Sequence, residues 1–178
     1  MLGEAPRAVT AESVAVRPAT AEDVDAIVSV LREAAAWLDA RAQHMWQTDE
    51  LNRDRIAESV ADGLFFVAEL AGEVVGTIKF QLSDPLFWPD MPEGEGAYVH
   101  RIAVRRRTAG GVVSGPLMEW AVRQCRILGR RVLRLDCEAS RVRLRAVYER
   151  HGFVHHSDRQ VGPYFVSRYQ LDVQEADE

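Results

Sequence analysis

The stretch from Tyr98 to Phe153 constrains the fold more than any other part of the chain. It combines two apolar strand patterns with two helical ones, and a loop of small residues lies before the first helix. Glycines between a strand and a helix favour phosphate binding, because unpaired backbone N–H groups and the positive end of the helix dipole point into one place. The sequence therefore predicts a nucleotide or coenzyme there. In chain order the stretch reads as a strand at 98–104, a basic turn at 105–107, a small-residue loop at 108–111, a helix, a strand at 132–137, a helix and the pair 152–153.

The rest of the chain predicts a mixed α/β sheet flanked by helices. Thr20 followed by Asp23 resembles a helix-capping box, and apolar residues then recur at helical spacing to about residue 38. Because Pro116 is tolerated only in the first turn of a helix, the central helix should begin no earlier than about Val113. The other expected elements are a strand at 14–17, a helix at 49–61, a hairpin of 64–70 with 74–82, a loop at 83–96, and strands at 154–157 and 164–171.

Length and composition indicate one globular domain, expected at 14–172 between a loose tail at 1–13 and an acidic tail at 173–178. No apolar run approaches the ~20 residues of a membrane span, and neither cysteine has a metal-binding neighbour, so we expect a cytoplasmic protein with reduced thiols and no membrane partner. Residues 1–96 carry 18 acidic and 7 basic side chains, a net charge of −11, whereas residues 97–178 have a net charge of +6. The acidic first half argues against a nucleic-acid partner.

Two motifs and the element order together carry a resemblance to a known family. Residues 99–104 (Val-His-Arg-Ile-Ala-Val), the glycine loop with its helix, and residues 146–153 (Ala-Val-Tyr-Glu-Arg-His-Gly-Phe) resemble the GNAT superfamily of N-acetyltransferases, over roughly residues 14–171. The resemblance implies a centrally splayed sheet, with acetyl-CoA as the acyl donor between two diverging parallel strands. It places the pantetheine arm beside Ile102, Ala103 and Val104, and the pyrophosphate around Arg107, Thr108, Ala109, Gly110, Gly111, Val112, Val113 and Ser114.

The chain departs from the family pattern at two places that bear on coenzyme binding. Ala109 stands where the family commonly has Gln or Arg, and Val112 stands where it commonly has Gly. Backbone N–H groups, which every residue except proline supplies, do most of the binding. Arg141 stands where family members often have an asparagine. Its guanidinium suits a CoA phosphate, and the alternative is that it belongs to a solvated helix face.

The chemistry of acetyl transfer to an amine calls for a base and a proton donor, without a metal. Tyr148 matches the catalytic tyrosine of the family, which implies a general acid for the departing thiolate. His100 is the candidate base, because an imidazole titrates near neutral pH; Tyr98 and Glu138 are the alternatives. His155 and the adjacent histidine point to opposite faces of a strand, so no histidine metal site is expected.

An amine acceptor would suit two clusters of aromatic and acidic residues, one around the first two helices and one in the long loop at 83–96. The candidate substrate-binding aromatics are Trp37, Trp46, Trp88 and Tyr98. The sequence is thus interpreted as an N-acetyltransferase that transfers acetyl from acetyl-CoA directly to a primary amine of a small molecule or peptide. The alternative is a non-catalytic acyl-CoA-binding regulatory domain. A homodimer that pairs through the apolar last strand at 164–166 is a further hypothesis.

Overall fold

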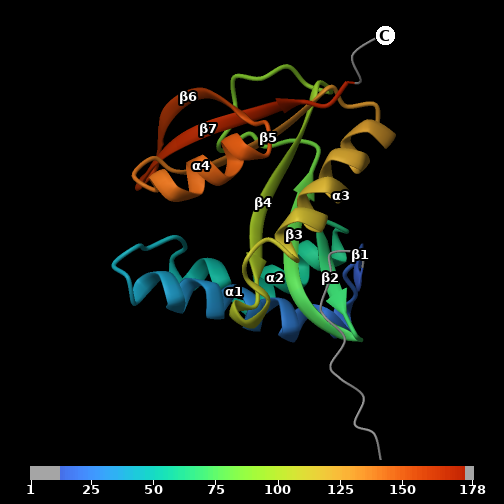
Figure 1. Cartoon of the computed structure of the whole chain (residues 1–178). Coiled ribbons are helices and arrows are strands. Elements are labelled where there is room, and N and C mark those ends of the chain that lie inside the picture. The colour runs from blue at the N-terminus through green and yellow to red at the C-terminus, as the bar shows by residue number, and fades with distance from the viewer. Residues whose placement is uncertain (1–12, 175–178) are drawn as a thin grey trace, which may run out of the picture.

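The computed structural model describes residues 13–174, which form a seven-stranded sheet with helices on both faces (Figure 1). Of the tails expected at 1–13 and 173–178, residues 1–12 and 175–178 lie outside the described residues. Val173, placed in the C-terminal tail by the sequence, is instead 1% exposed, and its amide donates to the Arg131 carbonyl (3.0 Å). The strands are β1 (Val14–Pro18), β2 (Phe65–Leu70), β3 (Glu73–Gln81), β4 (Gly96–Val104), β5 (Val132–Glu138), β6 (Val154–Val161) and β7 (Tyr164–Asp172). The helices are α1 (Val24–Asp39), α2 (Arg53–Ala61), α3 (Ser114–Ile127) and α4 (Val142–Arg150), with short 3-10 turns η2 (Ala21–Asp23), η3 (Thr48–Leu51) and η4 (Arg106–Thr108).

The sheet is splayed at its centre, as the resemblance implied. Its strand order is β1-β2-β3-β4-β5-β7-β6, and every neighbouring pair is antiparallel except β4 and β5. The parallel pair is joined only through three rungs, and the last rung pairs Tyr98 with Arg134. Beyond it β4 continues to Val104 and β5 to Glu138 without pairing with each other, while β4 stays paired with β3 and β5 with β7. The two strands therefore diverge, and Figure 1 shows β4 leaving β5 to run toward α1.

Each face of the sheet has its own apolar core. One cluster packs α3 and α4 against Ile78, Val99 and Leu135, and the other packs α1 and α2 against Phe65 and Val67. Both free cysteines are buried, in agreement with the expectation of reduced core thiols. Because side chains alternate along a strand, successive residues of β3 and β4 point in turn toward the α3–α4 cluster and toward the α1–α2 cluster.

Several local predictions are confirmed and two are wrong. The central helix begins at Ser114, and the hairpin turns at Ala71, as expected. The expected helix at 49–61 is instead interrupted at Asn52, whose extended backbone and side chain cap α2 by accepting a hydrogen bond from the Asp54 amide (2.8 Å). The last strand, β7, is hydrogen-bonded to β5 on one side and β6 on the other, so pairing with a second copy through it is not possible.

Within the described residues, none of the helices combines the length and apolar character needed to cross a membrane.

Candidate active site

A cavity of about 590 Å³ opens where β4 and β5 diverge. One wall is β4 from Val99 to Val104 and the other is β5 from Asp136 to Glu138. Helices α1, α3 and α4 and the loop after β3 also contribute lining residues. The cavity therefore occupies the place that backbone hydrogen bonds fill elsewhere in the sheet.

The loop before α3 presents free backbone amides. Gly110 and Gly111 have φ of +105° and +94°, in a region of backbone conformation that residues with a Cβ rarely adopt. In the described part of the chain, the amides from Gly111 to Ser114 donate no hydrogen bond to another backbone group. Pro116 is the third residue of α3, within its first turn. This confirms the reasoning from proline and leaves four N–H groups at a helix N-terminus, which is an arrangement that fits a phosphate.

The residues implied for coenzyme binding fall into two groups. Ile102, Ala103, Val104, Ser114 and Arg141 line the cavity. The others lie outside it. Arg107 forms an exposed ion pair with Glu73, Thr108 donates its hydroxyl to the Arg105 carbonyl, and Ala109, Gly110, Gly111, Val112 and Val113 complete the loop, with the Val113 side chain fully buried.

Arg106 lines the cavity although the sequence did not single it out. Its guanidinium lies 3.8 Å from the ring centre of Trp37, and Arg41 lies at 3.9 Å from the same ring. The backbone N–H of Arg106 donates to Glu33 (2.8 Å). The turn after β4 is therefore held against α1, and its positive charge is directed at the cavity.

Tyr148 on α4 has the properties of a proton donor. Its ring is buried between Phe153 and Tyr169, with ring centres 6.1 Å away in each case, and the residue lines the cavity. Among the described residues its hydroxyl has no hydrogen-bond partner, while burial raises the pKa of the phenol well above its usual value of about 10. The phenol therefore keeps its proton at neutral pH, and the proton is free for a ligand.

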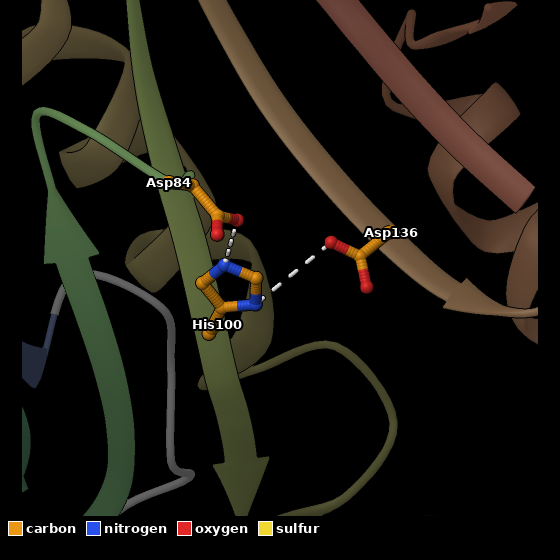
Figure 2. Close-up of side chains that lie close together, drawn as sticks. All are labelled: Asp84, His100 and Asp136. Atoms are coloured by element: carbon orange, nitrogen blue, oxygen red, sulfur yellow. Dashed lines mark hydrogen bonds and ion pairs between the residues drawn. The ribbon is translucent and has the colours of Figure 1, made fainter. Parts of the chain in front are cut away.

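His100 on β4 lies between two carboxylates that come from different elements (Figure 2). Its Nε2 is 2.7 Å from Asp84 Oδ2, in the loop after β3, and its Nδ1 is 3.9 Å from Asp136 Oδ2 on β5. The first distance is a hydrogen bond and the second is too long for one. If Nε2 carries the proton shared with Asp84, Nδ1 faces Asp136 with its lone pair available.

The two carboxyl groups differ in their protonation. Burial raises the pKa of Asp84. The hydrogen bonds that Asp84 accepts from His100 and from the amides of Leu86 and Phe87 have a larger combined effect, so the pKa is lowered overall. Burial raises the pKa of Asp136 above its ordinary value, against the opposing effect of His100. Oδ2 of Asp136 is shielded from solvent without a hydrogen bond at normal distance. Asp84 is therefore the charged partner of the imidazole, and Asp136 is the carboxyl that gains a proton more readily.

Donor atoms of Asp84, His100 and Asp136 all lie within 4.8 Å of one another, a spacing that metal ligands also have. This set shares no residue with the histidines near the C-terminus that were weighed as metal ligands from the sequence. In the structure Asp84 and His100 already use their facing atoms in a mutual hydrogen bond.

The four aromatic residues expected at the acceptor site separate into two pairs. Trp37 and Trp46 line the cavity. Trp88 and Tyr98 are 2% and 4% exposed and do not line it. Trp88 instead packs beneath the guanidinium of Arg168, 4.6 Å from its ring centre, and Arg168 in turn pairs with Asp90 (2.6 Å). The long loop is thus held against the sheet by Arg134 of β5 and Arg168 of β7, which pair with Glu95 and Asp90 of the loop. Sequence periodicity alone does not reveal these contacts.

Glu50 in η3 connects the α1–α2 segment to the far side of the cavity. It accepts hydrogen bonds from the Gln47 amide (2.7 Å), from Arg101 on β4 (3.3 Å) and from the Tyr164 hydroxyl on β7. Burial and the hydrogen bond to Glu50 raise the pKa of Tyr164 to about 12, so the phenol remains the donor. Close by, Arg141 Nη1 contacts Met45 Sδ (2.8 Å). This segment spans the open end of the splay.

The splayed sheet, the free amides before α3 and the protonated tyrosine in the cavity define an acyl-CoA-dependent transferase of the class that the sequence resembles. The model of the Acetyltransferase (GNAT) family matches residues 31–153, and the chain belongs to this family. It is accordingly an acetyl-CoA-dependent acyltransferase.

Individual relatives agree with this assignment. The chain is 30% identical over 142 residues to the uncharacterized N-acetyltransferase YesJ of Bacillus subtilis, which covers 76% of this chain and 79% of that protein. A GNAT acetyltransferase from Listeria monocytogenes superimposes with a TM-score of 0.75 at 24% identity, over 89% of this chain and 94% of that one. YncA from Salmonella typhimurium, solved with acetyl-CoA, gives a TM-score of 0.69 at 17% identity, over 93% and 96%.

Proposed function

We propose that this chain is an N-acetyltransferase that transfers acetyl directly from acetyl-CoA to a primary amine of a small molecule or peptide. The observation that carries the proposal is the pairing of two proton-handling groups in one cavity: Tyr148, which holds a proton without a partner, and His100, which is oriented by Asp84. Direct transfer to an amine requires both a proton acceptor and a proton donor. A domain that only binds acyl-CoA needs neither.

The donor end of the site is assigned to the loop before α3. The amides from Gly111 to Ser114 would bind the pyrophosphate, and Arg106 and Arg141 would add positive charge from the cavity wall. The exposed backbone of β4 between Ile102 and Val104 would pair with the amide groups of the pantetheine arm, because β5 leaves it unpaired there. Val112 would contribute its own amide, which belongs to the same free run. Acetyl-CoA supplies the acetyl group as an activated thioester.

The acceptor end is assigned to the face of the sheet that carries His100. Nδ1 of His100 accepts the proton that the ammonium must lose, while Asp84 holds the ring and Asp136 faces the same nitrogen. Tyr148 gives its proton to the departing sulfur. Trp37 and Trp46 form the aromatic part of the wall against which an amine-bearing cation packs.

Calorimetric titration with acetyl-CoA, beside desulfo-CoA and adenosine diphosphate, tests the donor end. Micromolar binding that depends on the pyrophosphate is expected. Thiol release in the presence of amines then tests transfer, and binding without turnover of any amine would favour the regulatory-domain alternative.

The base assignment is tested with His100→Ala and Asp136→Asn. Loss of the acidic limb of the pH–rate profile in the His100 variant supports the imidazole as base. An unchanged profile there, with the limb lost in the Asp136 variant, would transfer the role to the carboxyl.

A further inference from the structure

Lys79 is the only lysine in a chain with 22 lysines and arginines, and it lines the cavity. On β3 it is paired across strands with Phe65 on one side and with His100 on the other. Directly paired residues point to the same face of a sheet, and Phe65 packs in the cluster of α1 and α2. Lys79 therefore stands on the acceptor face, beside the proposed base. An ammonium differs from the guanidinium that the chain uses at every other basic position, because it is a compact point charge.

The ammonium of Lys79 has no counter-charge of its own. It is half-buried, and within residues 13–174 it makes no hydrogen bond or ion pair. Burial and the neighbouring charge of Arg101 lower the pKa of Lys79. Two carboxylates, Asp84 and Asp62, act on Lys79 only at a distance. Asp84 is engaged with His100 and with loop amides, and Asp62 is exposed. A half-buried cation that has lost part of its hydration gains from an anionic ligand that contacts it.

Arg101 offers a second unsatisfied donor on the same surface. Its φ of +54° marks an irregularity where the β3–β4 register shifts, and its guanidinium lies 5.1 Å from the ring centre of Trp46. Nη2 of Arg101 pairs with Glu50, but Nη1 is buried and has no partner among residues 13–174. Two cations with unused N–H groups thus meet beside a wall whose other end carries Asp136.

We propose that the acceptor amine carries a carboxylate, which Lys79 and Arg101 bind while its amino group lies against His100 and Asp136. This inference rests on the proposed function and deepens it by naming an amino-acid class of acceptor. The carboxylate of such a zwitterion would lie against the two cations, Lys79 and Arg101. Its amino group would lie at the other end of the acceptor face, against His100 and Asp136. A carboxylate is planar and accepts both a guanidinium and an ammonium, which makes each contact a charge-assisted hydrogen bond.

The test compares matched acceptors in matched variants. Amino acids, their primary amides and their decarboxylated amines are offered to the wild type, Lys79→Met and Lys79→Arg. The ratio of kcat/KM for acid to that for amide is the readout, because the reactivity of each amine cancels when this ratio is compared between variants. We expect the wild type to prefer acids, Lys79→Met to lower the ratio at least ~10-fold, as for one lost charge-assisted hydrogen bond, and Lys79→Arg to keep most of it.

Arg101 needs a control, since replacing it also removes its ion pair with Glu50. Arg101→Met should lower the acid-to-amide ratio, whereas Glu50→Gln, which weakens the same ion pair and leaves Nη1 in place, should preserve it. Affinity for acetyl-CoA should be unchanged in Lys79→Met, which separates an acceptor contact from a contact with the donor's phosphates.

The single lysine also permits a test without turnover. Lysine labelled with ¹³C gives one side-chain signal, from Lys79. Titration with N-acetyl amino acids should shift this signal and raise its titration midpoint, and the corresponding N-acetyl amides should not.

The inference is overturned if amines are acetylated without preference for a carboxylate, or if Lys79→Met leaves the acid-to-amide ratio within twofold, or if N-acetyl acids and amides shift the lysine signal alike. Absence of transfer to every acceptor, with acetyl-CoA still bound, would instead overturn the proposed function and this inference with it.

Discussion

Replacing Tyr148 by phenylalanine should separate catalysis from folding. The hydroxyl of Tyr148 makes no hydrogen bond within the described residues, so its removal costs little stability, under about 1 kcal/mol, and the ring keeps its packing against Phe153 and Tyr169. Loss of a general acid lowers kcat by roughly 10²- to 10⁴-fold, which corresponds to about 2.7–5.4 kcal/mol in the barrier. Steady-state thiol release, calorimetry with acetyl-CoA and urea unfolding measure the three quantities.

Tyr169 provides the matched control in the same cluster. Its hydroxyl donates to Glu149 (2.9 Å) and accepts from Arg145 (2.9 Å), and it takes no part in the proposed chemistry. Tyr169→Phe should therefore lose about 1–3 kcal/mol of stability and retain kcat within a few-fold. A Tyr148→Phe enzyme with kcat within threefold of the wild type would refute the general-acid role. If both variants lost activity in proportion to their stability, Tyr148 would be a packing residue.

Two further predictions concern glycines near the site, and a third concerns the ion pair between Arg17 and Asp23. Gly76→Ala places a Cβ 2.9 Å from Val113 Cγ1, so urea unfolding should show a loss of about 1–3 kcal/mol, and the displaced Val113 should raise KM for acetyl-CoA. Gly111→Ala meets no atom within 4 Å but strains a φ of +94° by about 1–2 kcal/mol, so calorimetry should show acetyl-CoA affinity reduced about tenfold; unchanged affinity would contradict a role for this loop. The hydrogen bond from Arg17 lowers the pKa of Asp23 to about 2, so its stabilisation is present above pH ~4 and is lost as pH falls through 2. We expect the free energy of unfolding to fall by roughly 1–2 kcal/mol over this pH range, because Arg17 is partly exposed. In Asp23→Asn this dependence on pH should be weaker, and unfolding midpoints measured from pH 5 to pH 2 check it.

Local sequence signals were sufficient for most of the elements and for the start of α3, which leaves the amides before it free. Pro116 limits where α3 can begin, because a residue without an N–H is tolerated only in the first turn of a helix. Thr20 and Asp23 mark the first helical turn because they hydrogen-bond to each other across three residues. The break at Asn52 was missed because the apolar spacing of a 3-10 turn followed by an α-helix resembles that of one continuous helix. The partners of His100 were missed because both are distant along the chain.

The aromatic residues illustrate the same limit. Trp88 lies among acidic residues in the sequence, which suggested an exposed surface for a cation. In the fold the cations come from the protein itself, because Arg134 and Arg168 project from β5 and β7 to meet Glu95 and Asp90 of the loop. Whether an aromatic residue in an acidic loop faces a substrate or a buried arginine depends on strand register, which local composition does not contain.

The register of the parallel pair explains why the polar cluster forms where the sheet opens. Tyr98 and Arg134 form the last rung between β4 and β5, and the Arg134 guanidinium donates to the Tyr98 hydroxyl (3.2 Å). Side chains alternate along a strand, so the next positions on the same face are His100 and Asp136, two residues further along each strand. With no backbone hydrogen bonds between the two strands at this point, His100 Nδ1 lies 3.9 Å from Asp136 Oδ2, and both residues line the cavity. The same loss of pairing that opens the cavity therefore places an imidazole and a carboxyl side by side in its wall.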